Sequence, residues 1–263
     1  MTNDTHCRLC GGSVQFLFSQ NVLGKYDVSY HRCTVCHSLQ TESPYWLEEA
    51  YLTHHLSCLD TGAAQRNLNN LVACYAISRL LKVTNVLDIG GGDGLLCRLL
   101  RDVGLNCYVK DKYAQPTYAQ GFTDPNFDTP DLVIGFEVLE HYPEPMADLD
   151  QLFALKPRAL LFSTALYTNQ TQTWWYLSPQ SGQHVFFYSQ QAMSIIASQY
   201  HYDMVISGGY ILFVKNSSWV TKMASTFLLK GKVRTLLKVI MAFLPVPGTW
   251  QDHAYLLAQS QQG

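Results

Sequence analysis

The sequence predicts an α/β protein with a mostly parallel sheet, preceded by a small cysteine-bearing module and followed by a helical segment. Three observations lead to this prediction. Apolar, strand-like runs alternate with helix-like segments from residue 62 to residue 215. Residues 86–94, VLDIGGGDG, place a glycine-rich turn between a strand and a helix. Two Cys-x-x-Cys pairs lie close together near the start of the chain.

Length and composition are those of a globular chain with a small and a large module. The chain has 263 residues, of which 48% are hydrophobic and 14% charged, so it falls outside the disordered class. Its net charge of −2 argues against nucleic-acid binding, because neutralising phosphates needs a basic excess. The first residues are polar and lack the apolar core of a signal peptide, and the longest apolar stretch, 236–245, is too short to span a bilayer. We therefore expect a cytoplasmic protein.

The cysteines of the first module, expected at residues 1–45, have the spacing of a metal site. Cys7 and Cys10 form one Cys-x-x-Cys pair, and Cys33 and Cys36 form a second pair 22 residues further on. Such a pattern predicts a structural Zn²⁺ held by four thiolates. The segments 13–20 and 27–33 alternate like two strands, which favours a zinc ribbon. The alternative is two thiol pairs without metal. A redox function is disfavoured, because a redox Cys-x-x-Cys pair would need a thioredoxin-like βαβ context that is missing.

The remaining cysteines have no such pairing. They occur singly, at Cys58, Cys74, Cys97 and Cys107. We interpret Cys97 and Cys107 as buried apolar filler.

Residues 46–216 are expected to form one α/β domain. Strands are predicted at 84–90, 105–111, 130–136 and 159–164, and helices at 62–83, 94–104, 146–157 and 189–200. Two further strands, 202–207 and 210–215, flank Gly208-Gly209 and are expected to form an antiparallel hairpin. The region between Asp111 and Asp131 has a poor strand pattern.

The glycine-rich turn indicates a nucleotide-like ligand that is not a dinucleotide. Gly90 and Gly92 fit Gly-x-Gly-x-x-Gly, but the third position falls on Leu95. Such a turn exposes backbone N–H groups at a helix N-terminus. Acidic side chains surround it at Asp88, Asp93 and Asp111. Because acids repel a diphosphate but suit an ammonium group and a ribose diol, the pattern points to S-adenosylmethionine.

At these residues the sequence resembles a known family. VLDIGGGDG resembles the first motif of the class I S-adenosylmethionine-dependent methyltransferases, and PDLVIGFEVLEHYPEP (130–145) resembles their fourth-strand motif. The resemblance covers residues 62–215 and implies a Rossmann-like sheet that ends in the antiparallel hairpin. It implies that Asp88 and the turn bind the amino-acid end of the cofactor and that Asp111 binds the ribose. The cofactor-binding residues it implies are Asp88, Gly90, Gly91, Gly92, Asp111, Phe136 and Glu137, with Phe122 and Phe136 as apolar walls.

The cysteine module narrows the resemblance to a smaller group within the class I methyltransferases. A zinc module ahead of a class I domain resembles the C-methyltransferases of deoxysugar biosynthesis and related enzymes of bacterial glycan and secondary-metabolite clusters. Residues 174–189, WWYLSPQSGQHVFFYS, resemble an aromatic Gly-Gln-His segment of such proteins. This implies C- or O-methylation of a small molecule, such as a sugar or a glycan or secondary-metabolite precursor. The aromatic residues either cap the substrate or form a hydrophobic cluster that attaches the ribbon.

The chemistry needs a group that removes a proton from the methyl acceptor. His184 has a suitable side chain and is predicted as the general base, with Glu140 and His141 as the competing pair. Glu137, Glu140 and His141 also match the Glu-x-x-Glu-His that binds a divalent ion in the ubiquinone-pathway O-methyltransferases. The alternative function is therefore metal-assisted O-methylation of a catechol-like acceptor.

The last segment, residues 217–263, is expected to be a basic amphipathic helical tail. Between Met204 and Gln251 there is no acidic residue, yet there are six lysines and arginines. Such helices either pack on the sheet or make peripheral contact with an anionic membrane. An alternative from another class is a catalytically silent binding module that recruits partners through the ribbon and the tail.

Overall fold

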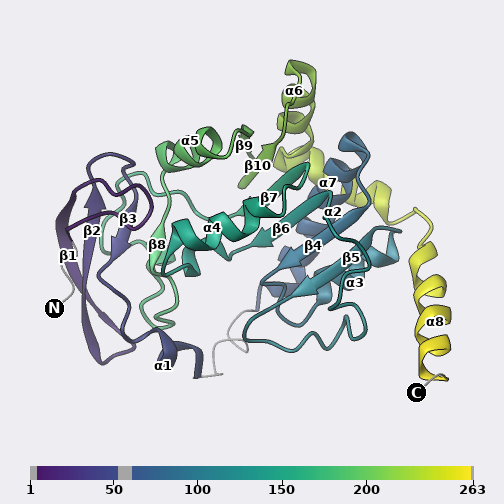
Figure 1. The fold of residues 1–263 in the computed structure, drawn as a ribbon, viewed down its shortest axis with the longest axis horizontal. Coiled ribbons are helices and arrows are strands. Elements are labelled where there is room, and N and C mark those ends of the chain that lie inside the picture. The colour runs from purple at the N-terminus through teal and green to yellow at the C-terminus, as the bar shows by residue number, and fades with distance from the viewer. Residues whose placement is uncertain (1–4, 53–60, 262–263) are drawn as a thin grey trace. The chain divides into compact units, whose positions relative to one another are not determined.

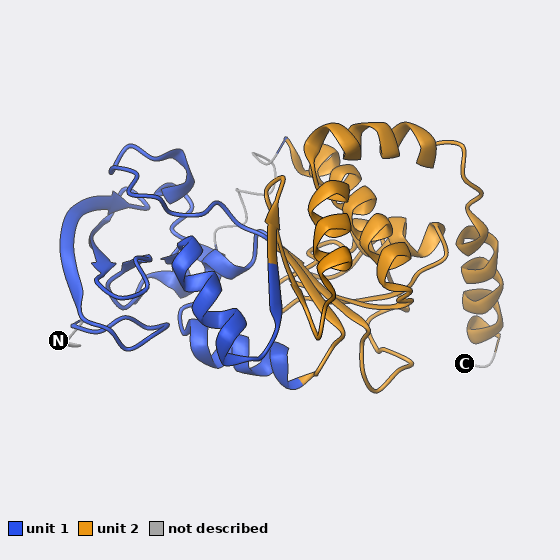
Figure 2. Cartoon of the chain, turned by 90° about the horizontal axis from the view of Figure 1, so that it is seen from above, with its two compact units in different colours: residues 1–61, 137–154, 163–204 blue, residues 62–136, 155–162, 205–263 orange. Residues whose placement is uncertain are grey.

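The computed structural model describes residues 5–52 and 61–261. The chain divides into two compact units, each assembled from separate segments (Figure 2). Unit 1 comprises residues 1–61, 137–154 and 163–204, and unit 2 comprises residues 62–136, 155–162 and 205–263. The domain boundaries expected from the sequence at residues 45 and 216 stay a prediction. Cys58 lies outside the described residues.

A six-stranded sheet forms the centre of unit 2 (Figure 1). Its strands are β4 (Asn85–Ile89), β5 (Asn106–Lys110), β6 (Leu132–Phe136), β7 (Ala159–Ser163), β9 (Asp203–Ser207) and β10 (Tyr210–Val214), in the order β5-β4-β6-β7-β10-β9. β4 pairs in parallel with both β5 and β6. The two-residue turn Gly208-Gly209, with φ of 57° and 86°, joins β9 to its neighbour β10, so this pair is antiparallel. The mixed α/β sheet with a terminal hairpin is therefore confirmed.

β5 lies at one edge of this sheet because the residues that follow it do not form a strand. Between Lys110 and Leu132 the described chain runs through turns. Pro116, Gly121 and Pro125 interrupt this stretch, and proline cannot donate to a sheet ladder. The poor strand pattern read from the sequence is confirmed.

Five helices of unit 2 accompany the sheet. They are α2 (Ala63–Leu81), α3 (Leu95–Asp102), α6 (Trp219–Leu228), α7 (Gly231–Met241) and α8 (Pro247–Ser260). The tail helices α6 and α7 contact α2, and α8 contacts α3. Within the described part of the chain, no helix is long and apolar enough to cross a membrane.

Unit 1 contains a second, four-stranded sheet. Its strands are β1 (Val14–Val22), β2 (Tyr26–Cys33), β3 (Leu39–Thr41) and β8 (Phe186–Phe187), in the order β1-β2-β3-β8. β1 and β2 form the antiparallel hairpin expected between the cysteine pairs. The unit also holds the helices α1 (Leu47–Leu52), α4 (Pro145–Ala154) and α5 (Gln190–Gln199) and the short 3₁₀ helices η2 (Leu139–His141) and η3 (Trp175–Leu177). β8 pairs with β3 through Leu39 and Phe187, so the ribbon sheet includes a strand from much later in the chain.

The aromatic loop at 174–188 supplies the core of unit 1. Tyr176 and Phe187 are buried together with Tyr30, Leu39 and Trp46 of the ribbon and the segment after it. Trp175, by contrast, is 78% exposed. Of the two interpretations of this loop, the structure favours the hydrophobic cluster, because burial occupies the rings that a substrate cap would have to present.

Candidate functional site

The glycine turn follows β4 and begins α3 with a backbone that only glycine adopts freely. Gly90, Gly92 and Gly94 have φ of 67°, 58° and 81°. Gly91 is constrained instead by space: a Cβ there would lie 2.5 Å from Asp88 Oδ2 and 2.6 Å from Val109 Cγ2. The turn therefore lies directly over the Asp88 carboxylate.

Asp111, one residue after β5, fixes the other side of the turn. Its Oδ2 accepts a 2.9 Å hydrogen bond from the Gly92 N–H, and its Oδ1 accepts 2.8 Å bonds from the N–H groups of Tyr113 and Ala114. Each carboxylate oxygen offers about two acceptor positions. Oδ2 therefore retains one position for a ligand donor such as a hydroxyl group.

Asp88 is buried beneath the turn without full hydrogen bonding. It is 2% exposed, and its Oδ2 has no hydrogen-bond partner within residues 5–52 and 61–261. Burial, and then the nearby Asp111, raise the pKa of this carboxyl to about 8. An unpaired buried acceptor under a turn that excludes even a methyl group fits a site for the ammonium end of S-adenosylmethionine.

The aromatic residues expected beside the cofactor are packed within unit 2. The Phe136 ring lies edge-on to Tyr210, with 5.8 Å between ring centroids. Phe122 is 1% exposed and lies beneath the Arg101 guanidinium, 3.7 Å from the ring centroid. Tyr255 of α8 also stacks on Phe122, so this ring supports the helices and is covered in the structure.

A second group of reactive side chains lies in unit 1. Glu140 and His141 belong to η2, and His184 precedes β8; their ligand atoms all lie within 4.8 Å of one another. The rings of His141 and His184 meet edge-to-face at 4.8 Å between centroids. The structure thus brings together the three predicted catalytic residues of the chain.

The hydrogen bond of His184 defines its tautomer. Nδ1 lies 2.7 Å from the backbone carbonyl oxygen of Tyr176. Because a carbonyl only accepts, Nδ1 carries the proton, and Nε2 of the neutral ring keeps a lone pair. Burial lowers the pKa of His184, which favours this neutral form. Nε2 can therefore accept a proton or bind a metal.

His141 has a different environment. Its Nδ1 lies 3.2 Å from the Tyr51 hydroxyl, and its Nε2 lies 3.9 Å from Glu140 Oε1. Burial, and then the nearby His184, lower the pKa of His141 to about 3, so this ring is also neutral.

Glu140 is the buried acid of the group. It is fully buried, and among the described residues neither of its carboxylate oxygens has a hydrogen-bond partner. Burial, and then the nearby Glu137, raise its pKa to about 8. Two unpaired oxygens beside two neutral imidazoles are a donor set that a divalent cation would satisfy.

Glu137 lies near Glu140, but both of its carboxylate oxygens accept hydrogen bonds from other partners. Its Oε1 accepts a 2.6 Å bond from Ser163 Oγ, and its Oε2 accepts a 2.8 Å bond from the Tyr176 hydroxyl. Its φ of 55° is unusual for a residue with a side chain. The group that could hold a metal is therefore Glu140, His141 and His184, without Glu137.

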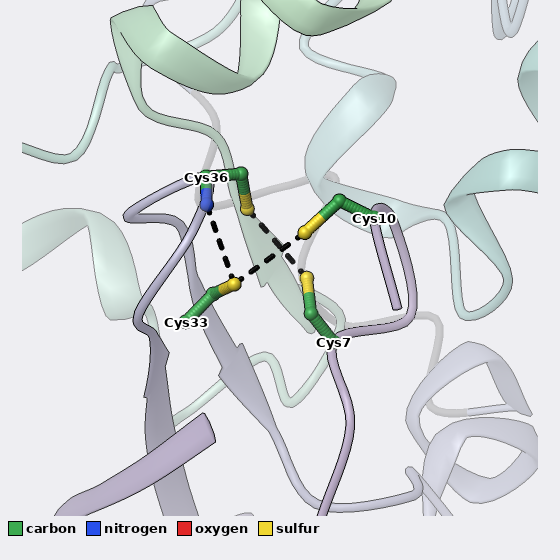
Figure 3. A group of neighbouring side chains, drawn as sticks. All are labelled: Cys7, Cys10, Cys33 and Cys36. Carbon is green, nitrogen blue, oxygen red and sulfur yellow. Dashed lines mark hydrogen bonds between the residues drawn. The ribbon is translucent and has the colours of Figure 1, made fainter. Parts of the chain in front are cut away.

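The four cysteines of unit 1 converge (Figure 3). The Sγ atoms of Cys7 and Cys36 are 3.6 Å apart, and those of Cys10 and Cys33 are 3.5 Å apart. Four thiolates around one zinc, with Zn–S bonds of about 2.3 Å, have sulfurs about 3.8 Å apart. The Cys33 sulfur also accepts bonds from the N–H groups of Val35 and Cys36 at 3.3 and 3.4 Å. The cluster could hold one tetrahedral zinc ion.

Sequence reasoning missed the supporting residues of these sites. Tyr176 orients both Glu137 and His184, and Tyr51 contacts His141. No local pattern distinguishes these tyrosines from the other tyrosines of the chain. The cysteines Cys97 and Cys107 are fully buried, as expected of apolar filler.

The glycine turn lies at the carboxyl end of β4, which is where open α/β sheets bind their ligands. A family model described as a methyltransferase domain matches residues 50–206, more than half of the chain. The chain therefore belongs to this family and is a methyltransferase. No curated protein matches the sequence.

Several solved structures are similar to parts of the chain. Magnesium protoporphyrin IX methyltransferase from Synechocystis has 19% identity and a TM-score of 0.44, over 58% of this chain and 83% of that chain. The 1,6-didemethyltoxoflavin-N1-methyltransferase of Burkholderia thailandensis has 12% identity and a TM-score of 0.48, over 75% of this chain and 97% of that chain. Human N-acetylserotonin methyltransferase has 16% identity and a TM-score of 0.40, over 57% and 52% of the two chains.

Proposed function

We propose that this protein transfers a methyl group from S-adenosylmethionine to a carbon or oxygen atom of a small molecule, such as a sugar or a glycan or secondary-metabolite precursor. The observation that supports it most is the glycine turn over Asp88, whose Oδ2 has no partner among the described residues, together with the acceptor position that Asp111 Oδ2 retains. The cofactor supplies an electrophilic methyl group, and the chain must hold its ammonium and ribose ends. Asp88 and Asp111 have the charge and hydrogen-bonding capacity for these two tasks.

Calorimetric titration with S-adenosylhomocysteine tests the cofactor site. The parent protein should bind it, and Gly91→Ala should bind at least tenfold more weakly because the new Cβ displaces the Asp88 carboxylate. Gly231→Ala is the matched control: its Cβ has no neighbour closer than 4.0 Å. Absence of binding by the parent protein would remove the proposal.

Within this function, His184 is the proposed general base. The carbonyl of Tyr176 fixes the neutral tautomer whose Nε2 lone pair can take a proton from the methyl acceptor. Glu140 and His141 remain the competing pair. Glu140 is weaker as a base because a carboxyl with a pKa of about 8 is protonated at neutral pH.

A second candidate function is supported by the geometry of the same group. Glu140, His141 and His184 form a two-histidine, one-carboxylate set of the kind that binds divalent metals. A bound cation would stabilise an oxyanion of the methyl acceptor and support metal-assisted O-methylation. Metal analysis separates the candidates: Glu140→Gln should lower the metal content of the chain only if this second site is occupied.

For the cysteine cluster we propose one structural Zn²⁺, bound by Cys7, Cys10, Cys33 and Cys36. Their sulfur positions and the N–H bonds to Cys33 support it. The role is structural, because four thiolates leave no open position for a substrate.

The alternative to an active enzyme is a catalytically silent binding module. Such a protein would bind S-adenosylhomocysteine yet transfer no methyl group to a pooled small-molecule extract.

A further inference from the structure

The tail helices α6 and α7 carry apolar residues on their outer faces. On α6 the exposed residues are Trp219, Val220, Met223 and Phe227, and on and just after α7 they are Leu236, Val239, Ile240 and Phe243. In each set the spacing places the residues on one side of a helix. Phe243 is 85% and Trp219 is 73% exposed, and Trp250 on α8 is 78% exposed. An ordinary surface carries exposed apolar residues singly, whereas α6, α7 and the start of α8 carry a group of them.

The side of α7 that packs carries Arg234 together with the half-buried Leu237 and Met241. Arg234 lies opposite the apolar stripe, and its Nη1 donates a 3.0 Å bond to the Tyr210 hydroxyl. Its Nη2 donates a 2.9 Å bond to the Gly208 carbonyl, and its Nε donates a 3.0 Å bond to the Leu229 carbonyl. No residue of α7 is buried. The exposed apolar stripe of α7 is therefore additional to the apolar residues through which the helix packs.

The charge of the same segment is one-sided. Residues 204–251 contain Lys215, Lys222, Lys230, Lys232, Arg234 and Lys238 and no acid. Outside this segment, 12 lysines and arginines face 20 aspartates and glutamates. Lys230 and Lys232 are exposed at the start of α7. This segment therefore combines a net positive charge with a large share of the exposed apolar residues of the chain.

From these observations we propose that α6, α7 and the start of α8 form a docking surface for an anionic lipid bilayer. The aromatic and aliphatic side chains enter the headgroup region, and the lysines contact lipid phosphates. A second copy of the chain fits less well, because a symmetric face-to-face dimer would bring two acid-free basic segments together. The methyltransferase would then act on a substrate at the membrane surface, a consequence that rests on the proposed function.

Vesicle flotation of the full chain tests the surface without using activity. The protein should bind vesicles of phosphatidylcholine and phosphatidylglycerol at a three-to-one ratio at least tenfold more tightly than vesicles of phosphatidylcholine alone. Phe243→Ser and Trp250→Ser should each lower the partition coefficient about tenfold. Lys230→Gln and Lys232→Gln should each lower it about fivefold, and rising salt should weaken binding.

Two control variants lie outside the surface. Phe16→Ser removes an aromatic side chain of the ribbon hairpin that is 60% exposed, and Lys156→Gln removes an exposed lysine elsewhere; neither should change vesicle binding. Equal binding to both vesicle types, or none to either, overturns the proposal. If the protein forms a dimer without lipid and Phe243→Ser dissociates this dimer, the surface binds a second copy of the chain instead. Because cofactor binding is measured separately, failure here leaves the proposed function standing.

Discussion

Nδ1 of His184 lies 2.7 Å from the carbonyl oxygen of Tyr176, which fixes the imidazole with its lone pair on Nε2. If this lone pair removes the proton of the methyl acceptor, His184→Ala should lower turnover by roughly a hundredfold to ten-thousandfold. The affinity for S-adenosylhomocysteine should stay nearly unchanged. Turnover is measured as transfer of labelled methyl groups to a pooled small-molecule extract.

His141→Ala is the comparison variant. Its ring lies edge-on to His184 and contacts Tyr51, so we expect it to weaken cofactor or metal binding as well as turnover. A His184→Ala protein whose turnover stays within a few-fold of the parent would return the role of base to Glu140 and His141.

The second prediction concerns the pH dependence of cofactor binding. The pKa of Asp88 is raised to about 8, so the side chain is mostly protonated at neutral pH. Binding an ammonium group favours the carboxylate, and the proton must leave on binding. The affinity for S-adenosylhomocysteine should therefore fall by about tenfold per pH unit as pH drops below 8. Calorimetry across this range measures it, and Asp88→Asn should bind weakly with no such slope.

The raised pKa of Asp88 also predicts how the stability of the folded protein depends on pH. A carboxyl whose pKa rises from 3.8 to about 8 on folding opposes folding increasingly as pH rises between these values. Asp88→Asn should therefore raise the melting temperature of the ligand-free protein, and more at pH 8 than at pH 5. The exposed Asp124→Asn is the control and should change neither quantity. A lower melting temperature for Asp88→Asn at pH 8 would contradict the assigned shift.

Zinc binding is the third prediction. The parent protein should contain about one zinc per chain, and Cys36→Ser should lose most of it, because zinc binding supplies the folding energy of such sites. Cys97→Ala removes a buried cysteine of unit 2 and should keep the metal. Metal analysis by mass spectrometry gives the content, and hydrogen exchange should show lost protection in unit 1 with unit 2 largely protected. Full zinc in Cys36→Ser would refute the assignment.

The docking of α8 on α3 is the basis of the fourth prediction. Arg101 forms two 2.7 Å contacts with Asp252, through Nε and Nη2, and Arg98 forms a third. A Cβ on Gly248 would lie 1.7 Å from the Arg101 carbonyl oxygen. Gly248→Ala should therefore detach α8 and make it sensitive to limited proteolysis. Asp252→Ala should destabilise the chain by about 3–5 kcal/mol because Arg101 loses its carboxylate partner, whereas Arg98 keeps its ion pair with Asp102.

The matched variant for this prediction is Gly231→Ala, which also changes a glycine in the first turn of a tail helix. Its Cβ meets no atom closer than 4.0 Å, so α7 should stay in place. Equal protease sensitivity of the Gly248→Ala, Gly231→Ala and parent proteins would show that α8 does not depend on this contact.

Local patterns explain which parts of the fold were predictable. The strands β4, β5 and β6 are continuous apolar runs, and the glycine turn is a contiguous motif whose acids adjoin it. The cysteine cluster follows from spacing alone. Ser189 begins the helix predicted at 189–200, and as its N-cap it accepts a bond from the Ala192 N–H through its hydroxyl.

The features that sequence reasoning missed depend on distant segments. The grouping of His184 with Glu140 and His141 spans more than forty residues and depends on the backbone bond from the Val185 N–H to the Glu140 carbonyl. The Arg101–Asp252 pair joins residues 151 positions apart. Such contacts are set by tertiary packing, and a single sequence carries no periodicity or spacing that reports them.

The late arrival of β8 in the ribbon sheet has a consequence for biosynthesis. Residues 36–46 of the ribbon and the segment after it contact residues 182–189. β3 pairs with β8, the Trp46 indole donates to the Gly182 carbonyl at 2.8 Å, and the Ser189 hydroxyl donates to the carbonyl of Cys36. On the ribosome, the first cysteines emerge long before these partners. A nascent chain paused before residue 182 would thus expose the edge of β3 and the Trp46 side chain, so expression should depend on chaperones that shield the early ribbon until translation passes β8.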